Sequence, residues 1–192
     1  MFLEQFPQDG KPHGWIEVIC GSMFSGKTEE LIRRLRRAEF ANQKLLLFKP
    51  LIDDRYVAER IMSHNGSTFE AIQLSSAKKL YDYWKKERLV AIDEVQFFDQ
   101  EIVAVATDLA NKGVRVICAG LDMDFKGIPF GPMPHLLSSA EYVTKVHAIC
   151  ISCGVPAQFS HRKSKESADQ VMLGAKEEYE PLCRACYNKI QH

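Results

Sequence analysis

Short apolar runs alternate with amphipathic segments along most of the chain. The clearest runs occupy residues 15–20, 45–48, 89–92 and 114–119, and weaker runs occupy 70–74 and 142–149. The clear runs are rich in β-branched and other large apolar residues, and polar residues or glycines bound them. Continuous apolar runs of this length predict strands that are covered on both faces, as in a parallel sheet.

The segments between these runs have helical periodicity. Residues 28–42 place Leu31, Ile32, Leu35 and Ala38 on one side, and residues 77–86 and 102–111 are also amphipathic. Strands that alternate with helices predict an α/β fold, with a parallel sheet and helices on both of its faces. In such folds ligands bind at the carboxyl ends of the strands. Residues 120–134, which are rich in glycine and proline, predict an irregular loop at that edge.

The stretch after the first apolar run fits the pattern G-x-x-x-x-G-K-[ST] at every fixed position. A predicted strand precedes it and a predicted helix follows, which is the context that a phosphate-binding loop requires. Backbone N–H groups of such a turn, with the positive end of the helix dipole, bind phosphate oxygens. We expect the lysine to reach the outer phosphates and the threonine hydroxyl to coordinate Mg²⁺. The candidate phosphate ligands are Gly21, Ser22, Met23, Phe24, Ser25, Gly26, Lys27 and Thr28.

An acidic pair, Asp93 and Glu94, follows the third clear apolar run. It should lie on the same sheet edge as the phosphate loop. We expect Asp93 to hold Mg²⁺ opposite Thr28. Glu94 should point elsewhere, because side chains alternate along a strand, and is then free to act as a general base. The pair alone does not separate a hydrolase, which activates water, from a kinase, which activates a hydroxyl group.

Composition narrows the class of protein. The 192 residues suit one compact domain with a small appendage, and the 46% hydrophobic content is enough for a core. Lys plus Arg and Asp plus Glu are 25 each, so no global positive field favours nucleic acid or a membrane surface. No run is long and apolar enough to span a membrane, and residues 1–14 read as a loose lead-in without signal-peptide features. We therefore expect a cytoplasmic protein with reduced cysteines.

Two C-x2-C pairs, Cys150 with Cys153 and Cys183 with Cys186, occur where the composition changes. Four thiolates suit tetrahedral Zn²⁺, and we expect a small second unit over residues 150–192. Between the pairs, residues 160–170 are almost wholly polar, whereas residues 171–174 and Tyr179 are apolar or aromatic. A lid over a substrate fits this pattern. A surface loop without fixed structure fits it nearly as well.

Together these residues resemble the thymidine kinase family of the cellular, zinc-containing type (type II). The resemblance runs from about residue 15 to 187, and its motifs are GSMFSGKT, DDRY at 53–56, DEVQFF at 93–98, LDMDF at 121–125, PFG at 129–131 and the cysteine pairs. It implies a P-loop (RecA-like) nucleotide-binding domain at 15–149 and a zinc-binding lasso at 150–192. It also implies a cytoplasmic homotetramer that is inhibited by its end product, dTTP.

The activity that the resemblance implies is transfer of the γ-phosphate of ATP to the 5′-hydroxyl of thymidine, for nucleotide salvage. Glu94 would be the general base, and Thr28 with Asp93 would position Mg²⁺. Further phosphate-site residues would be Asp53, Arg55, Asp93 and Gln96. The thymidine site would comprise Met23, Phe97, Leu121, Phe125, Ser160, Gln170, Val171, Met172, Leu173, Gly174 and Tyr179. Family members often carry threonine at the position of Ser160, and the serine here lacks the threonine methyl group at the pocket rim.

Two other functions share some of these features. A zinc-ribbon P-loop ATPase that acts on nucleic acid would use Glu94 to polarise water, but the chain has zero net charge and no aromatic-basic strip. A structural subunit regulated by a nucleoside triphosphate would bind nucleotide without turnover. Formation of a nucleoside monophosphate separates the kinase from both.

Overall fold

A computed structural model describes residues 13–51, 60–62, 68–163 and 178–191. Its centre is a six-stranded sheet with the order β5-β2-β6-β7-β1-β8. Every neighbouring pair in this sheet is parallel, which confirms the predicted α/β class. The strands are β1 (Trp15–Cys20), β2 (Leu45–Pro50), β5 (Ile72–Leu74), β6 (Leu89–Ile92), β7 (Arg115–Gly120) and β8 (Tyr142–Lys145).

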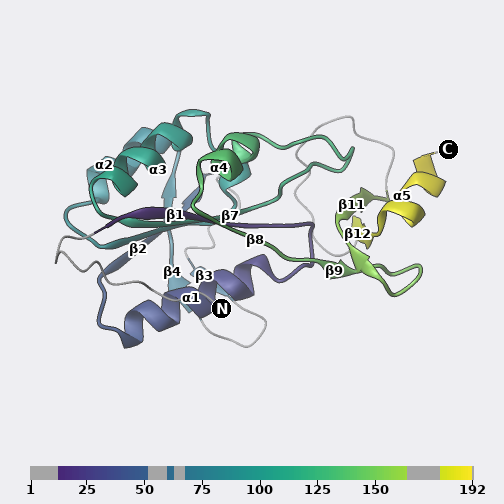
Figure 1. Cartoon of the computed structure of the whole chain (residues 1–192), viewed down its shortest axis with the longest axis horizontal. Helices are drawn as coiled ribbons and strands as arrows, with labels where there is room; N and C mark the ends of the chain where they lie inside the picture. The colour runs from purple at the N-terminus through teal and green to yellow at the C-terminus, as the bar shows by residue number, and fades with distance from the viewer. Residues whose placement is uncertain (1–12, 52–59, 63–67, 164–177, 192) are drawn as a thin grey trace.

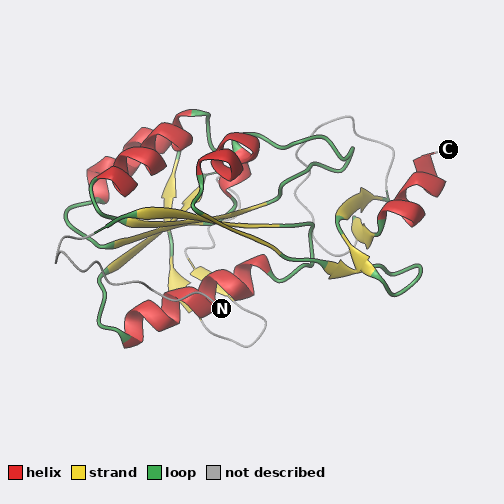
Figure 2. Cartoon of the chain, viewed as in Figure 1, coloured by secondary structure: helices red, strands yellow, loops and turns green. Residues whose placement is uncertain are grey.

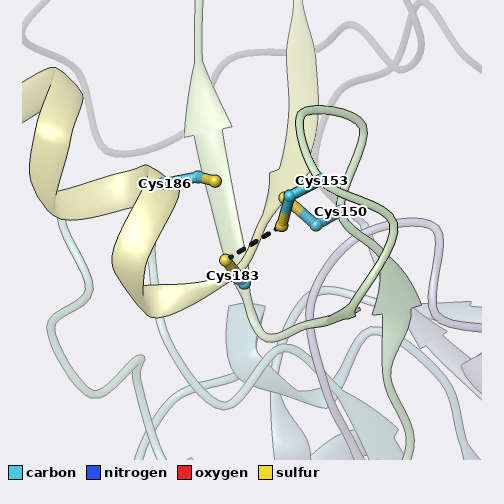
Figure 3. Close-up of side chains that lie close together, drawn as sticks. All are labelled: Cys150, Cys153, Cys183 and Cys186. Atoms are coloured by element: carbon cyan, nitrogen blue, oxygen red, sulfur yellow. Dashed lines mark hydrogen bonds between the residues drawn. The ribbon is translucent and has the colours of Figure 1, made fainter.

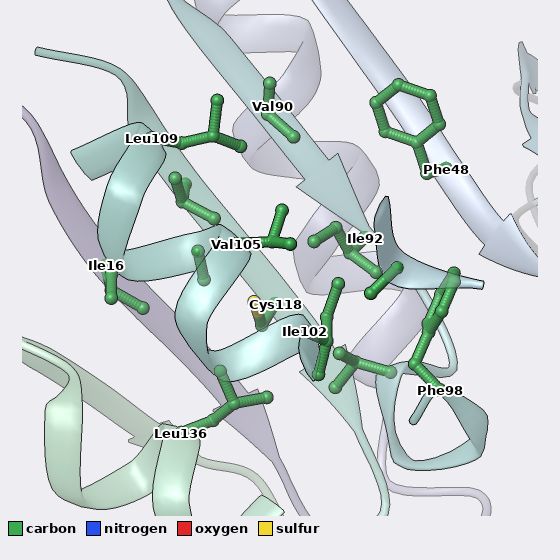
Figure 4. Packing of buried hydrophobic residues seen from close by; sticks show 14 of the residues in the cluster. Ile16, Phe48, Val90, Ile92, Phe98, Ile102, Val105, Leu109, Cys118 and Leu136 are labelled. Carbon is green, nitrogen blue, oxygen red and sulfur yellow. The ribbon is translucent and has the colours of Figure 1, made fainter. Parts of the chain in front are cut away.

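Helices cover both faces of the sheet (Figures 1 and 2). One face carries α1 (Lys27–Phe40), and the other carries α2 (Leu80–Tyr83), α3 (Glu101–Asn111) and α4 (Met133–Ser139). Alternate residues of each strand supply the two cores. In β6, Val90 and Ile92 pack on the α3 side, whereas Leu89 and Ala91 pack on the α1 side. Figure 4 shows the α3 side, where Ile102, Val105 and Leu109 meet the strands. Two buried faces explain why β6 is apolar at every position.

Three local predictions are wrong in detail. The helix expected over 77–86 is a short 3₁₀ turn, η1 (Ala77–Lys79), followed by α2, because Trp84 is already extended. Residues 70–74 do not form one strand: β4 (Thr68–Glu70) pairs with β3 (Arg60–Met62) in a separate ribbon, and only β5 joins the main sheet. The strand expected over 142–149 is divided between β8 and β9 (Ala148–Ile149).

The C-terminal segment lies at one end of the sheet, beyond the carboxyl ends of its strands (Figure 1). It comprises β9, β10 (Pro156–Ala157), β11 (Phe159–Arg162), β12 (Tyr179–Leu182) and α5 (Arg184–Gln191). Its own apolar cluster includes Ala157, Phe159, Leu182 and Tyr187, and the rings of Phe159 and Tyr187 are stacked. Met123, from the loop after β7, packs against this cluster and ties it to the sheet edge.

Among the described residues, no helix combines the length and the apolar character that crossing a bilayer would require.

Candidate functional site

The phosphate loop joins β1 to α1 by a turn that needs unusual backbone angles. Gly21, Phe24 and Gly26 all have positive φ, at 147°, 64° and 86°. A side chain at Gly21 would collide with the carbonyl oxygen of Val146, so glycine is required there for close approach as well as for φ. The turn delivers the chain to the first residues of α1, which has 14 residues and therefore a substantial dipole.

Lys27 folds back over this turn. Its Nζ donates to the carbonyl oxygen of Ser22 at 2.8 Å, and the hydroxyl of Ser25 donates to the same carbonyl at 2.7 Å. Lys27 is only 8% exposed. Burial lowers the pKa of Lys27, while Glu94, Asp93 and Asp122 favour its charged form. The Lys27 side chain is therefore held at the loop, close enough to three carboxylates for them to favour its charged form.

The acidic pair lies across from this lysine. Asp93 follows the last residue of β6, and its backbone N–H donates to the carbonyl of Phe48 at 2.9 Å. Burial raises the pKa of Asp93 to about 7, and the neighbouring Glu94 adds to the rise. An oxygen-rich group of this kind suits Mg²⁺, which prefers carboxylate and hydroxyl oxygens. Thr28, whose hydroxyl is the other predicted Mg²⁺ ligand, lies in the first turn of α1.

Glu94 does not lie in a strand, so the prediction that strand alternation directs its side chain away from that of Asp93 is wrong. β6 ends at Ile92, and Glu94 adopts the left-handed conformation, with φ 51° and ψ 38°, just before η2 (Val95–Phe97). Its N–H donates to Oδ1 of Asp93 at 3.0 Å. A positive φ is uncommon outside glycine and often marks a functional position.

Gln96 joins two of the sequence motifs. Its side-chain Nε2 donates to Oε2 of Glu94 at 2.6 Å, and its Oε1 accepts from the backbone N–H of Leu121 at 3.0 Å. Phe97, next in the chain, makes an edge-to-face contact with Phe130, the centroids lying 5.4 Å apart. The DEVQFF, LDMDF and PFG stretches therefore meet at the carboxyl edge of the sheet.

The C-terminal segment contacts the phosphate loop directly. The backbone N–H of Met23 donates to the Ser160 hydroxyl at 2.9 Å, and the Ser22 hydroxyl lies 3.4 Å from the carbonyl oxygen of Ala157. Ser160 belongs to β11 and is 4% exposed. The predicted thymidine-site residues Met23 and Ser160 are therefore in contact.

Two further predicted residues, Phe125 and Tyr179, share one partner, Arg162. The guanidinium carbon of Arg162 lies 3.7 Å from the ring centroid of Phe125. Its Nη2 and Nε donate to the Tyr179 hydroxyl at 2.9 and 3.2 Å. The hydroxyl of Tyr187 holds the same loop by donating to the Phe125 carbonyl at 2.8 Å. Asp53, Arg55 and residues 170–174 lie outside the described residues.

Two of these groups, Arg162 and Asp122, have little signal in the sequence. Arg162 reads as part of a polar arm, and only its pairing with Tyr179 across β11 and β12 reveals its position. Asp122 is 8% exposed, and its Oδ2 pairs with Lys145 at 2.7 Å. Its place two residues after the apolar strand β7 was the available signal, since Asp93 likewise follows an apolar strand.

The four paired cysteines converge in space (Figure 3). All four Sγ atoms lie within 4.8 Å of one another, and those of Cys153 and Cys183 are 3.6 Å apart. Tetrahedral zinc with Zn–S bonds of about 2.3 Å places its sulfurs about 3.8 Å apart, so the group fits the ion. A backbone hydrogen bond from Cys183 is the main cause that lowers the pKa of Cys150 to about 6, which favours the thiolate that zinc needs. Cys20 and Cys118 are buried elsewhere, in the α3-side core.

Comparisons with known proteins agree over nearly the whole chain. A family model described as thymidine kinase matches residues 14–187. A thymidine kinase of Bacteroides fragilis is 53% identical over 189 residues, which cover 98% of this chain and 94% of that protein. A thymidine kinase of Bacteroides thetaiotaomicron is 54% identical over 187 residues, which cover 97% and 94%. An X-ray structure of the Legionella pneumophila ATPase DotB covers 67% of this chain and 35% of that chain, at 20% identity and a TM-score of 0.40. Because the family model and both relatives span almost all of its residues, this chain belongs to the thymidine kinase family.

Proposed function

We propose that the chain transfers the γ-phosphate of Mg²⁺-bound ATP to the 5′-hydroxyl of thymidine, giving dTMP and ADP. The observation that carries this proposal is the meeting, at one sheet edge, of a phosphate loop, an acidic pair and an aromatic cluster. Membership of the thymidine kinase family favours an organic hydroxyl over water as the acceptor. It therefore favours the kinase over the nucleic-acid ATPase and the structural subunit.

In this proposal the phosphates bind the backbone N–H groups of residues 21–28. Lys27 exchanges its present acceptor, the Ser22 carbonyl, for an outer phosphate oxygen. Asp93 and Thr28 would hold Mg²⁺, whose chemistry when bound is to neutralise charge on the transferred group. Asp53 and Arg55 would lie near the same phosphates. The predicted phosphate role of Gln96 differs from the bonds its side chain makes here, to Glu94 and Leu121.

Glu94 is the proposed general base. Its carboxylate takes the proton from the 5′-hydroxyl as that oxygen forms a bond to the γ-phosphorus. The bond between the γ-phosphorus and the oxygen that bridges it to the β-phosphate breaks, and ADP leaves with that oxygen. General-base assistance of this kind contributes about 10²- to 10⁴-fold to the rate.

The thymine ring would lie among the aromatic and apolar side chains at the contact between the sheet edge and the C-terminal segment. Phe125 and Tyr179 are already linked there through Arg162, and Ser160 is bonded to Met23. The remaining walls would be Phe97 and Leu121. Main-chain groups of residues 170–174 would form hydrogen bonds with the edge of the base. In mostly apolar pockets a few polar groups of this kind fix the orientation of the ligand.

Several finer assignments belong to the same proposal. We expect a lead-in at 1–14, a nucleotide-binding domain at 15–149 and a zinc-binding lasso at 150–192. We also expect a cytoplasmic homotetramer that dTTP inhibits and that serves pyrimidine deoxynucleoside salvage. The cysteine cluster supports the zinc assignment by its sulfur spacing.

The test is to incubate the protein with Mg²⁺-ATP and a panel of nucleosides and to separate the products. We expect ADP and dTMP in equal amounts with thymidine, and little ADP without a nucleoside. ATP hydrolysis that nucleic acid stimulates, without any monophosphate, would support the ATPase instead. Nucleotide binding without any turnover would support the structural subunit.

A further inference from the structure

The Gln96 side chain lies between the Glu94 carboxylate and the backbone of Leu121, which directly follows β7. It is 2% exposed, and both ends of its amide are used, by the Glu94 carboxylate at 2.6 Å and the Leu121 N–H at 3.0 Å. The chemistry of the partners fixes the orientation of the amide. A backbone N–H can only donate, so it requires the amide oxygen, and the NH₂ end must then face the carboxylate.

Two glycines make room for this glutamine. A side chain at Gly120 would approach Oε1 of Gln96 closely, and one at Gly131 would collide with the Gln96 backbone carbonyl. Gly131 also has a φ of 50°, which favours glycine. The neighbouring chain therefore closes around Gln96 from the β7 end and from the loop before α4. Interiors packed in this way hold side chains in one rotamer.

The backbone at Glu94, the partner of Gln96, is equally constrained. Glu94 has a positive φ, and its N–H is bonded to Asp93. Phe97, three residues after Glu94 and at the end of η2, packs on Phe130. The left-handed turn fixes where the Glu94 side chain begins, and the Gln96 amide fixes where one of its oxygens ends.

We propose that Gln96 is a positioning residue for Glu94: its amide holds Oε2, presents Oε1 to the acceptor hydroxyl, and ties the carboxylate to the backbone at Leu121. This inference rests on the proposed function of Glu94 as general base. It assigns Gln96 to the proton-accepting group rather than to a phosphate. Leu121 is a proposed wall of the thymine pocket, so Gln96 anchors the carboxylate to the backbone beside that pocket.

Two substitutions separate the two bonds. Gln96→Leu removes both with little change in size, whereas Gln96→Glu keeps an acceptor for Leu121 but replaces the donor to Glu94 with a repelling carboxylate. We expect kcat to fall about 10- to 100-fold in both, because the base loses its orientation. The KM values for thymidine and ATP should stay within about threefold of those of the wild type. The matched control is Gln100→Leu. Gln100 is an exposed glutamine that precedes α3, and this variant should keep wild-type kinetics.

A double-mutant cycle with Glu94→Gln then tests whether Gln96 acts through Glu94. Since the carboxylate is absent in that background, adding Gln96→Leu should lower the residual kcat by less than about twofold. Thermal melting identifies any variant that is unfolded, and Gln96→Glu keeps the test valid if Gln96→Leu does not fold.

The outcomes are distinct. Loss of kcat with unchanged KM and no further loss in the double variant supports the inference. An unchanged kcat in Gln96→Glu overturns it. A raised KM for ATP in both backgrounds also overturns it, because Gln96 would then act on the phosphates. If Glu94→Gln itself retains full turnover, the general-base proposal fails first, and the role of Gln96 falls with it.

Discussion

Burial shifts the pKa values of Lys27, in the phosphate loop, and of Asp93, which lies near it. It lowers the pKa of Lys27 and raises the pKa of Asp93 to about 7, so each charged form is stabilised less by water than it would be in an exposed position. A metal ion and a polyphosphate would replace the missing water with opposite charge. These two buried side chains therefore lower the stability of the ligand-free protein, because their arrangement suits a bound ligand.

The raised pKa of Asp93 predicts a pH-dependent stability. The folded pKa of about 7 lies above the ordinary value of 3.8, so the folded state binds the proton more tightly than the unfolded state. This contribution is complete below pH 3.8 and is lost as the pH rises to about 7. Asp93→Asn should then raise the melting temperature of the ligand-free protein by a few degrees at pH 8, and by much less at pH 5.

Melting curves without nucleotide or Mg²⁺ measure this difference. Asp82→Asn, at an exposed aspartate in α2, is the control and should leave the melting temperature unchanged at both pH values. A lower melting temperature for Asp93→Asn at pH 8 would mean that the attraction between Asp93 and Lys27 exceeds the cost of burial.

Arg162 shows how one cation can orient two rings. Its planar guanidinium lies against Phe125 and forks to the Tyr179 hydroxyl, a geometry that lysine cannot reproduce. Arg162→Lys should raise the KM for thymidine about tenfold and leave the KM for ATP within about twofold, because only the nucleoside pocket is affected. Initial rates with each substrate varied in turn provide the measurement.

Arg184→Lys is the matched control, since the exposed Arg184 also lies over a ring, that of Phe159, at 5.1 Å. It should change neither KM. Equal increases in both KM values for Arg162→Lys would indicate a general loss of structure instead of a loss of pocket geometry.

At the scale of elements, the sequence predicts the sheet well because its central strands β6 and β7 are buried on both faces. Apolar residues at consecutive positions, such as Leu89 to Ile92, are typical of a strand that is covered on both faces. The phosphate loop and the acidic pair are predictable for a related reason, since both follow such strands. The division of the strand expected over 142–149 was less predictable: the Val146 N–H still donates to the Cys20 carbonyl of β1, and the chain then turns to β9, which pairs with β10.

Elements that depend on distant contacts were not predictable. The helix α4 begins in a stretch whose prolines and glycines suggested only a loop, yet Pro134 falls in its first turn, where proline is tolerated. The helix is stabilised by the burial of Met133 and Leu136 against the sheet. The positive φ of Glu94 likewise depends on the turn into η2 and has no local sequence signal such as glycine.

The contact between β11 and the phosphate loop also gives a prediction. Ser160→Ala removes the acceptor of the Met23 N–H at a buried position, so kcat/KM for thymidine should fall about 3- to 10-fold. Ser160→Thr keeps the hydroxyl and should retain most of the activity. Ser139→Ala, on an exposed helical serine, is the control. If Ser160→Ala matches the wild type in steady-state assays, the hydrogen bond between Met23 and Ser160 does not contribute to activity.

At the scale of the whole molecule, the cysteine cluster joins segments that are far apart in the sequence. Cys150 and Cys153 precede β11, whereas Cys183 and Cys186 follow β12. A metal ion bound there would hold together the strands that carry Ser160, Arg162 and Tyr179. The metal would thus support the nucleoside pocket without taking part in phosphate transfer.

Loss of this ion should therefore affect the two substrates unequally. We expect one zinc ion per chain by elemental analysis. Cys153→Ser should lower the zinc content. It should also weaken thymidine binding by about tenfold or more, while ATP still binds the phosphate loop. Ser152→Ala, on an exposed residue of the same turn, is the control. Zinc-free protein that binds thymidine like the wild type would contradict this prediction.

The central claim is that Glu94 accepts the proton of the nucleoside hydroxyl. The most direct test compares wild type and Glu94→Gln for dTMP formation at saturating substrates and for thymidine binding by calorimetry. Glu39→Gln, on the exposed face of α1, serves as the control. We predict that Glu94→Gln lowers kcat by about 10²-fold or more while thymidine binds within about threefold of the wild-type affinity. A variant that forms dTMP at the wild-type rate would contradict the claim.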